Sequence, residues 1–336
     1  MKKDSSFAAE VPERTFGYIV GLLAYGFPAG MLWGAYGMLI LPFEGTRMNP
    51  SNPAVFLLGM LFMAGLSQFT GPVAGYLSDH SQHDYGRRRP FFLAANMVGI
   101  PGLFCQWIAS THQADFFPSP ENPTGRFYAG LYVVAFFISM TAFNVQNVVI
   151  AGLLSDLIPQ AQVGTANGVL GFLMLTGSLA SCGIYNAMEY LYDTYPDTCP
   201  SQNIAACGIE NMYLVFITFV TVGSTITLIF AKETPLEHAS PWSWKELKQT
   251  FSLDPVKHHD FYYVTVSRTF YYCALSTQAF LQYYFRDVVQ PHGNMLGLTT
   301  FRPPPPNLFV SFVCLSVCLS HTHVLSVYVL YQMFML

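Results

Sequence analysis

Charged residues are scarce in this sequence. Only 10% of the 336 residues are Asp, Glu, Lys or Arg, whereas an ordinary soluble domain carries about 25%. Apolar residues make up 52% of the chain, so we expect the solvent of this protein to be lipid. The net charge is −4 and the few basic residues lie in loops, which argues against a nucleic-acid partner.

Motifs of enzymes and metal sites are missing as well. The seven cysteines show neither CxxC spacing nor a pattern of histidine partners, so no zinc or redox site is predicted. We find no nucleophile–base pair, metal-ligand spacing or phosphate loop, and we expect neither enzyme activity nor a cofactor. Cys199 and Cys207 share one predicted outer loop, where a short disulfide and two free thiols are the alternatives.

Long apolar segments, in contrast, recur along the chain. A membrane helix needs about 20 apolar residues, and stretches of polar residues separate seven such segments. They are roughly Phe16–Pro42, Ala54–Leu77, Phe91–Ser110, Phe127–Leu154, Thr165–Met188, Met212–Ala231 and Phe261–Val289. The first is too long and too far from the start to be a cleaved signal peptide. The sequence therefore predicts an all-α, polytopic membrane protein.

Basic residues are distributed unevenly between the two sides of these spans. With a cytoplasmic N-terminus, ten Lys and Arg lie inside and four lie outside, and Arg268 lies within a span. This bias follows the positive-inside rule. It places residues 43–53, 111–125 and 189–211 outside, and it makes 232–260, with four lysines, the longest inner connection.

The inner connection divides the sequence into parts. We predict a cytoplasmic N-terminus over 1–15, a six-helix unit over 16–231, a linker over 232–260 and the first helix of a second unit over 261–290. This is the plan of a two-halved transporter. The tail 291–336 contains a doubled VCLS and an HTH, which translated tetranucleotide and CA repeats would encode. We expect an intron-derived tail, with an eighth span as the alternative.

The loop after the second span carries a distinctive pattern of charges. GYLSDHSQHDYGRRRP, residues 75–90, resembles the signature loop of the major facilitator superfamily. Its long spacer and RRRP ending are similar to those of glycoside-pentoside-hexuronide symporters and plant sucrose transporters. AGLLSDLIPQAQVGTANG, KETPLE and RTFYYCALSTQAFLQYYFRDVV resemble segments in the same places of that group. The resemblance covers about residues 16–290 and implies two six-helix halves that rock around a central substrate path.

This resemblance implies a gating role for the charges of the loop. Asp79 ends the second span, where a carboxylate opposes the helix dipole and needs a positive partner. The family takes that partner from a second-half helix and from the loop arginines, which can also pair with acids on the same side to form a latch over the cytoplasmic mouth. The gating residues are Gly75, Asp79, Gly86, Arg87, Arg88, Arg89, Asp156 and Glu233. The alternative is that the arginines only hold the loop inside.

Two histidines in the loop depart from the family pattern. His80 stands where the family usually has Arg or Lys, which weakens the latch at neutral pH and predicts a pH-sensitive one. A metal site at His80 and His83 lacks further ligands and is not expected.

Within the limits given above, spans one to six contain essentially no buried Asp, Glu, Lys or Arg. In alignment with plant sucrose transporters, Met140 replaces a proton-handling Asp and Ala151 replaces a substrate-pairing Arg, so proton-coupled sucrose uptake is in doubt. Uncharged polar and aromatic groups remain near mid-membrane depth, and they suit a neutral polyhydroxylated ligand. The candidate substrate contacts are Trp33, Tyr36, Asn144, Asn147 and Gln278. The alternative is that the amides only bond between helices, at about 0.6 kcal/mol each.

We therefore predict a transporter of a sugar or similar neutral polar solute, working by alternating access and incomplete as given. Such a chain needs a missing second half or another subunit for transport. The alternative is a non-transporting membrane fragment that acts only through helix association. In either case the lipid bilayer is the main partner.

Overall fold

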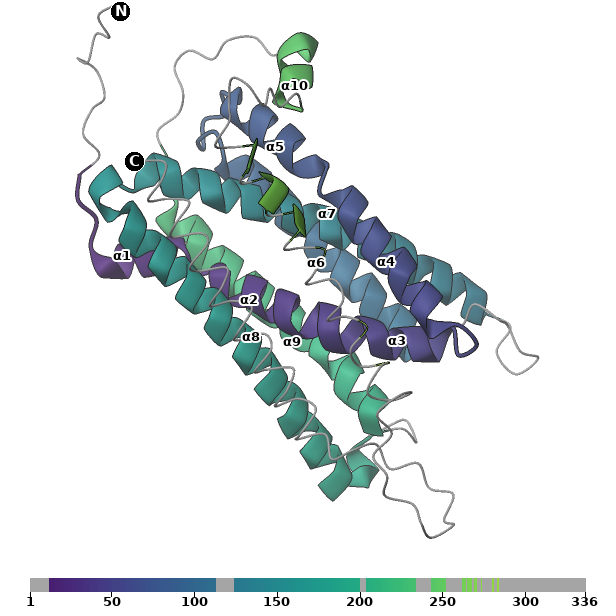
Figure 1. Cartoon of the computed structure of the whole chain (residues 1–336). Helices are drawn as coiled ribbons and strands as arrows, with labels where there is room; N and C mark the ends of the chain where they lie inside the picture. The colour runs from purple at the N-terminus through teal and green to yellow at the C-terminus, as the bar shows by residue number, and fades with distance from the viewer. Residues whose placement is uncertain are drawn as a thin grey trace, which may run out of the picture.

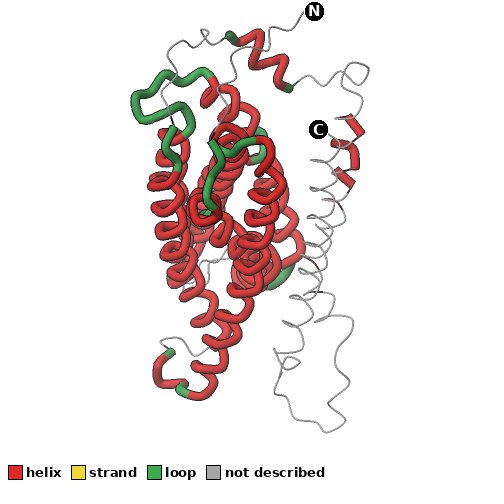
Figure 2. The backbone as a smooth tube through the Cα atoms, turned by 90° about the vertical axis from the view of Figure 1, so that its left-hand side faces the viewer, coloured by secondary structure: helices red, strands yellow, loops and turns green. Residues whose placement is uncertain are grey.

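A computed structural model describes residues 12–112, 124–199, 204–233 and 243–251, with single positions between 262 and 283. Every regular element among these residues is a helix (Figure 2). Six helical segments are long and apolar enough to cross a membrane: Gly26–Met48, Pro53–Asp79, Arg89–Thr111, Gly125–Leu157, Gln160–Thr194 and Ala206–Phe230. The predicted all-α polytopic fold is confirmed. Gln278 and the tail 291–336 lie outside the described residues, and the division into units stays a prediction.

The first span consists of consecutive helical segments. They are α1 (Phe16–Leu22), α2 (Gly26–Met31), the π-helical segment η1 (Leu32–Ile40) and α3 (Leu41–Met48). We predicted an end at Pro42, but the helix continues to Met48. Pro42 lies in the first turn of α3, which is the part of a helix where the missing N–H of proline is tolerated. The longer span brings two further charged residues, Glu44 and Arg47, into the bundle.

The second span is α4 (Pro53–Ser67) followed by α5 (Thr70–Asp79), and the rest are α6 (Arg89–Thr111), α7 (Gly125–Leu157), α8 (Val163–Thr194) and α9 (Ile204–Phe230). The first span lies between α8 and α9 on one side and α4 to α7 on the other (Figure 1). Short helices η2 (Gln160–Gln162) and η3 (Pro196–Thr198) flank α8, and α10 (Trp244–Thr250) belongs to the predicted linker. Helix α10 lies at the end of α5, whereas the turn between α3 and α4 lies at the opposite end of the bundle (Figure 1).

Helices α2 and α8 approach each other backbone to backbone. A Cβ atom at Gly30 would overlap the carbonyl of Met174, and one at Gly177 would overlap the carbonyl of Phe27. The hydroxyl of Ser178 donates to the carbonyl of Gly30 at 2.7 Å. Small residues at helix contacts of this kind are typical of membrane proteins, where packing and interhelical hydrogen bonds replace the hydrophobic effect.

Candidate functional site

The loop between α5 and α6 is shaped by one glycine. Gly86 has φ of +104°, a conformation that residues with a side chain rarely adopt. A Cβ here would also lie 2.7 Å from the side chain of Glu233. The turn brings the backbone N–H groups of Arg88 and Arg89 to the Glu233 carboxylate, at 2.9 and 3.0 Å. A carboxylate is favourable there because the first N–H groups of α6 are unpaired and the helix dipole is positive.

Arg88 joins the ends of two helices. Its guanidinium lies 2.8 Å from Asp79 at the end of α5 and 2.7 Å from Asp156 near the end of α7. Arg87 also reaches Asp156 at 2.7 Å, and this hydrogen bond raises the pKa of Arg87 above its ordinary value. The carboxylates of Asp79 and Asp156 lie at the C-terminal ends of their own helices, where the negative end of the helix dipole makes a negative charge unfavourable. The positive charges of the arginines offset this cost.

The sequence anticipated part of this cluster. The structure brings Arg87 and Arg88 to Asp156, as expected, and it pairs Asp79 with a loop arginine. Glu233 was expected to form an ion pair with the loop arginines, but its carboxylate instead accepts hydrogen bonds from backbone N–H groups. Gly75 packs against Val148, and a Cβ there would meet that side chain at 3.4 Å. The gating role of these residues stays a prediction.

His80 has a partner that the sequence did not indicate. Its Nδ1 lies 2.8 Å from the carbonyl of Tyr76, and its Nε2 lies 3.8 Å from the carboxylate of Glu246 in α10. The hydroxyl of Tyr76 accepts from the backbone N–H of Ser243 at 2.8 Å. The linker helix is therefore docked on the end of α5, next to the loop.

The interior of the bundle holds a chain of uncharged polar groups. The hydroxyl of Tyr25 donates to Gln146, whose amide donates to Asn96 at 2.8 Å. A parallel set begins at Tyr36, whose hydroxyl donates to Gln106. The amide of Gln106 in turn donates to Ser139 at 2.8 Å. Sequence analysis missed both glutamines, and the signal that could have found them is an uncharged amide within a long apolar run.

The predicted substrate contacts fall into different environments. Trp33 is 47% exposed, whereas Tyr36 is buried and stacked on Phe136 of α7. Asn144 is also buried, and its amide donates to Ser67 of α4 at 2.7 Å. Asn147 is half-buried on the same helix. Trp33 is thus exposed and Asn147 partly exposed, while Tyr36 and Asn144 are engaged between helices; a contact of any of them with a substrate stays a prediction.

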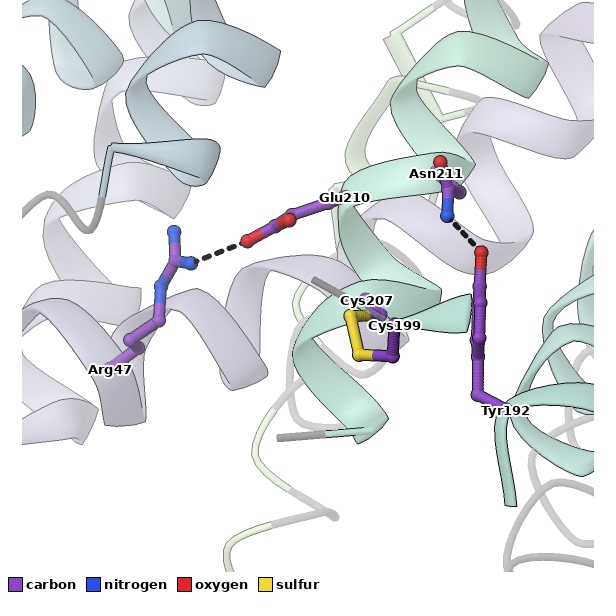
Figure 3. The surroundings of a disulfide bond; sticks show 6 residues. All are labelled: Arg47, Tyr192, Cys199, Cys207, Glu210 and Asn211. Atoms are coloured by element: carbon purple, nitrogen blue, oxygen red, sulfur yellow. Dashed lines mark hydrogen bonds and ion pairs between the residues drawn. A yellow bond between two sulfur atoms is a disulfide. The ribbon is translucent and has the colours of Figure 1, made fainter. Parts of the chain in front are cut away.

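A buried charged cluster corrects the expectation that spans one to six lack charge. Glu44 of α3 is 0% exposed, pairs with Arg47 at 2.7 Å and accepts from the hydroxyl of Ser110 at 2.7 Å. Arg47 also lies 3.4 Å from Glu210 of α9 (Figure 3). The expectation was wrong because the first span extends past Pro42.

The same end of α9 carries a disulfide. Cys199 and Cys207 are joined, with their Cα atoms 6.0 Å apart (Figure 3). One turn further along α9, Glu210 contacts Arg47, and Asn211 donates to the hydroxyl of Tyr192 in α8. The disulfide therefore ties the start of α9 next to its contacts with α3 and α8.

Two of the pockets on the described surface lie away from the predicted substrate contacts. One of about 240 Å³ lies along α4 and next to Val133, and one of about 320 Å³ lies beside residues 50–55 and Tyr283.

The helices and this arrangement of buried polar groups define a multi-pass integral membrane protein. No family model matches the chain. It is 27% identical over 176 residues to a sucrose transport protein of Arabidopsis thaliana, covering 51% of this chain and 30% of that protein. A second Arabidopsis thaliana sucrose transport protein is 26% identical over 226 residues, covering 65% and 42%. The general alpha-glucoside permease of Schizosaccharomyces pombe is 27% identical over 248 residues, covering 70% and 41%.

The chain is therefore homologous to sucrose transport proteins and an alpha-glucoside permease, which agrees with the resemblance found in the sequence. It spans less than half the length of each of these three relatives.

Proposed function

We propose that this chain forms the first half of a carrier that moves a neutral sugar across a membrane by alternating access. The observation that carries the proposal is the homology to two sucrose transport proteins and an alpha-glucoside permease. The six-helix arrangement supports it, because carriers of this type enclose their substrate between two six-helix halves. A second half, in the same or another polypeptide, completes the substrate path.

The chemistry of the interior supports a neutral solute. Hydroxyl and amide groups from Tyr25, Gln146 and Gln106 lie inside the bundle, whereas the buried charges sit at its two ends, around Glu44 and around Arg88. A sugar is recognised by a few directed hydrogen bonds and an apolar platform. Trp33 and Asn147, which are accessible, supply the first ligand contacts in this proposal.

The charged loop is the gate of the proposed carrier. Arg88 holds the ends of α5 and α7 together through Asp79 and Asp156. Inward opening moves these ends and breaks part of the cluster. The side chains of Arg88 and Asp156 are only 9% and 23% exposed, so their ion pair is partly shielded from water. Asp79 is 47% exposed, and its pair with Arg88 is screened like a surface pair.

We place the loop and the N-terminus on the cytoplasmic side. A cysteine at position 85, where Tyr85 is exposed, is expected to react with an impermeant thiol reagent only after the membrane is permeabilised, because basic loops stay inside. A cysteine at Asn52, in the exposed turn between α3 and α4, is the matched control and is expected to react in intact cells. Labelling of position 85 from outside contradicts the orientation.

Transport itself is best tested in a chimaera. Residues 12–260 replace the corresponding half of the Schizosaccharomyces pombe permease, and uptake of radiolabelled maltose and sucrose is measured in a yeast strain without such carriers. We expect saturable uptake by the chimaera and none by the 336-residue chain alone, because alternating access needs two halves. Replacing Asn147→Ala is expected to lower uptake roughly tenfold, the size of one lost hydrogen bond at a site.

Controls separate folding from function in this experiment. A chimaera with the matching half of the Arabidopsis thaliana sucrose transport protein shows that the junction is tolerated. Normal surface expression without uptake, beside an active control chimaera, contradicts the proposed function and favours a membrane protein that acts through helix association. Saturable uptake by the 336-residue chain alone contradicts the requirement for a second half.

A further inference from the structure

The first span changes its helical geometry between Leu32 and Ile40. This segment, η1, is π-helical, and the backbone N–H of Leu41 that follows it bonds to the carbonyl of Tyr36, five residues earlier. A π turn is wider than an α turn, is rare, and is frequent at functional sites. Because the α form is the usual one for a chain of L-residues, contacts with other helices are needed to hold the π form.

The wide turn separates two aromatic residues, Trp33 and Tyr36. Residues three apart in an α-helix share one face, and a wider turn rotates them further from each other. Trp33 is 47% exposed, whereas Tyr36 is only 2% exposed. At Gly37, one turn beyond Trp33, an added Cβ would have no neighbour within 4 Å. The π form thus directs Tyr36 into the bundle and leaves Trp33 on an open face.

Tyr36 is held in the bundle by three other spans. Its hydroxyl donates to Gln106 of α6, and the amide of Gln106 donates to Ser139 of α7 at 2.8 Å. Its ring stacks on Phe136 of α7 at 5.8 Å between centroids and meets the edge of Phe216 of α9 at 6.2 Å. Gln106 is 0% exposed. Because a buried amide left without its partner is costly, Gln106 favours the inward position of Tyr36.

We propose that Gln106 is a positioning residue: it holds Tyr36 inside the bundle, keeps η1 in the π form and so fixes Trp33 on the open face, where it contacts the sugar. The inference rests on the proposed function, because the carried sugar is the ligand of Trp33. The flat apolar face of the indole fits the C–H face of a pyranose ring. Without Gln106, η1 rewinds toward an α-helix, and Tyr36 turns outward to pack beside Trp33.

The fluorescence of Trp33 tests this positioning without requiring transport. The 336-residue chain is placed in lipid nanodiscs with its other three tryptophans replaced, through Trp107→Phe, Trp242→Phe and Trp244→Phe, and acrylamide quenching is measured. Gln106→Met is expected to lower the quenching constant about twofold, because Tyr36 then covers part of the indole.

A second substitution is expected to rescue the variant. Tyr36→Phe added to Gln106→Met restores the original quenching, because replacing both partners of a buried hydrogen bond by apolar groups leaves nothing unpaired. Ser139 keeps its hydrogen bond to the carbonyl of Phe136 at 3.0 Å. If Gln106→Met fails to fold, Ser139→Ala is the milder variant, and a smaller fall in quenching is expected.

The matched control is Gln146→Met. Gln146 is also 0% exposed and also accepts from a tyrosine hydroxyl, that of Tyr25, which lies before η1. We expect this variant to lose stability like Gln106→Met but to keep the quenching of Trp33 unchanged. Unchanged quenching in Gln106→Met, or an equal fall in Gln146→Met, overturns the positioning role.

Uptake by the chimaera gives the functional readout. Gln106→Met is expected to raise the KM for sugar about threefold and to leave the maximal rate nearly unchanged, because a contact made equally before and during translocation affects binding alone. In a Trp33→Ala background the same substitution is expected to add nothing. A fall in quenching without uptake by any chimaera contradicts the proposed function and leaves the positioning of η1 standing. Uptake with unchanged quenching contradicts the positioning alone.

Discussion

Replacing Arg47 by methionine is expected to destabilise the protein by about 3–5 kcal/mol, the cost of leaving one partner of a buried ion pair uncompensated. Glu44 is 0% exposed and has Arg47 at 2.7 Å. Methionine keeps much of the volume of arginine but offers no charge. The Ser110 hydroxyl, which donates to Glu44 at 2.7 Å, cannot neutralise the carboxylate. The measurement is equilibrium unfolding in detergent micelles.

A double variant separates charge from packing. Arg47→Met combined with Glu44→Gln removes the fully buried carboxylate together with its partner, and it is expected to recover most of the lost stability, because the acid that remains, Glu210, has a side chain that is 18% exposed to solvent. Arg126→Met at an exposed position of α7 is the control and is expected to change little. A double variant no more stable than Arg47→Met would show that the arginine acts through packing.

The positions of the first six membrane helices could be predicted well from sequence, whereas most of the predicted seventh span, Phe261–Val289, lies outside the described residues. An apolar run of about 20 residues has few alternatives in lipid, because its backbone groups must be satisfied within the segment. The error at Pro42 shows the limit of proline as a stop signal. A proline in the first turn of a helical segment is compatible with a helix that continues beyond it. Here the helix continues past Pro42 and brings Glu44 and Arg47 into the bundle.

Interactions between distant residues were harder to predict. The pairing of Asp156 with Arg87 follows from charges that share one side of the membrane. The role of Glu233 does not, because it depends on the left-handed turn at Gly86, which presents backbone N–H groups to the carboxylate. Tyr36 was predicted to face a ligand, but its partner Gln106 is a single amide in an apolar run, with nothing in the sequence to assign it a neighbour.

Close contact between α2 and α8 leads to the second large effect that we expect. The stretch around Gly177 meets the backbone of α2, and a Cβ at this position would overlap the carbonyl of Phe27. The added Cβ and the carbonyl of Phe27 are both fixed to helix backbones, so neither can rotate away. The two helices must therefore move apart, which also strains the hydrogen bond from Ser178 to the carbonyl of Gly30 at 2.7 Å.

Gly177→Ala is accordingly expected to destabilise the protein by about 3 kcal/mol, the upper part of the range for overpacked cores. Gly168→Ala is the matched control on the same helix, because an added Cβ there has no neighbour within 4 Å. It is expected to be neutral or to stabilise by up to about 1 kcal/mol, since alanine is the better helix former. Thermal unfolding of both variants in detergent gives the comparison. Because the two substitutions are chemically identical, their difference isolates the α2–α8 contact, and equal stabilities would mean that these helices do not pack this closely.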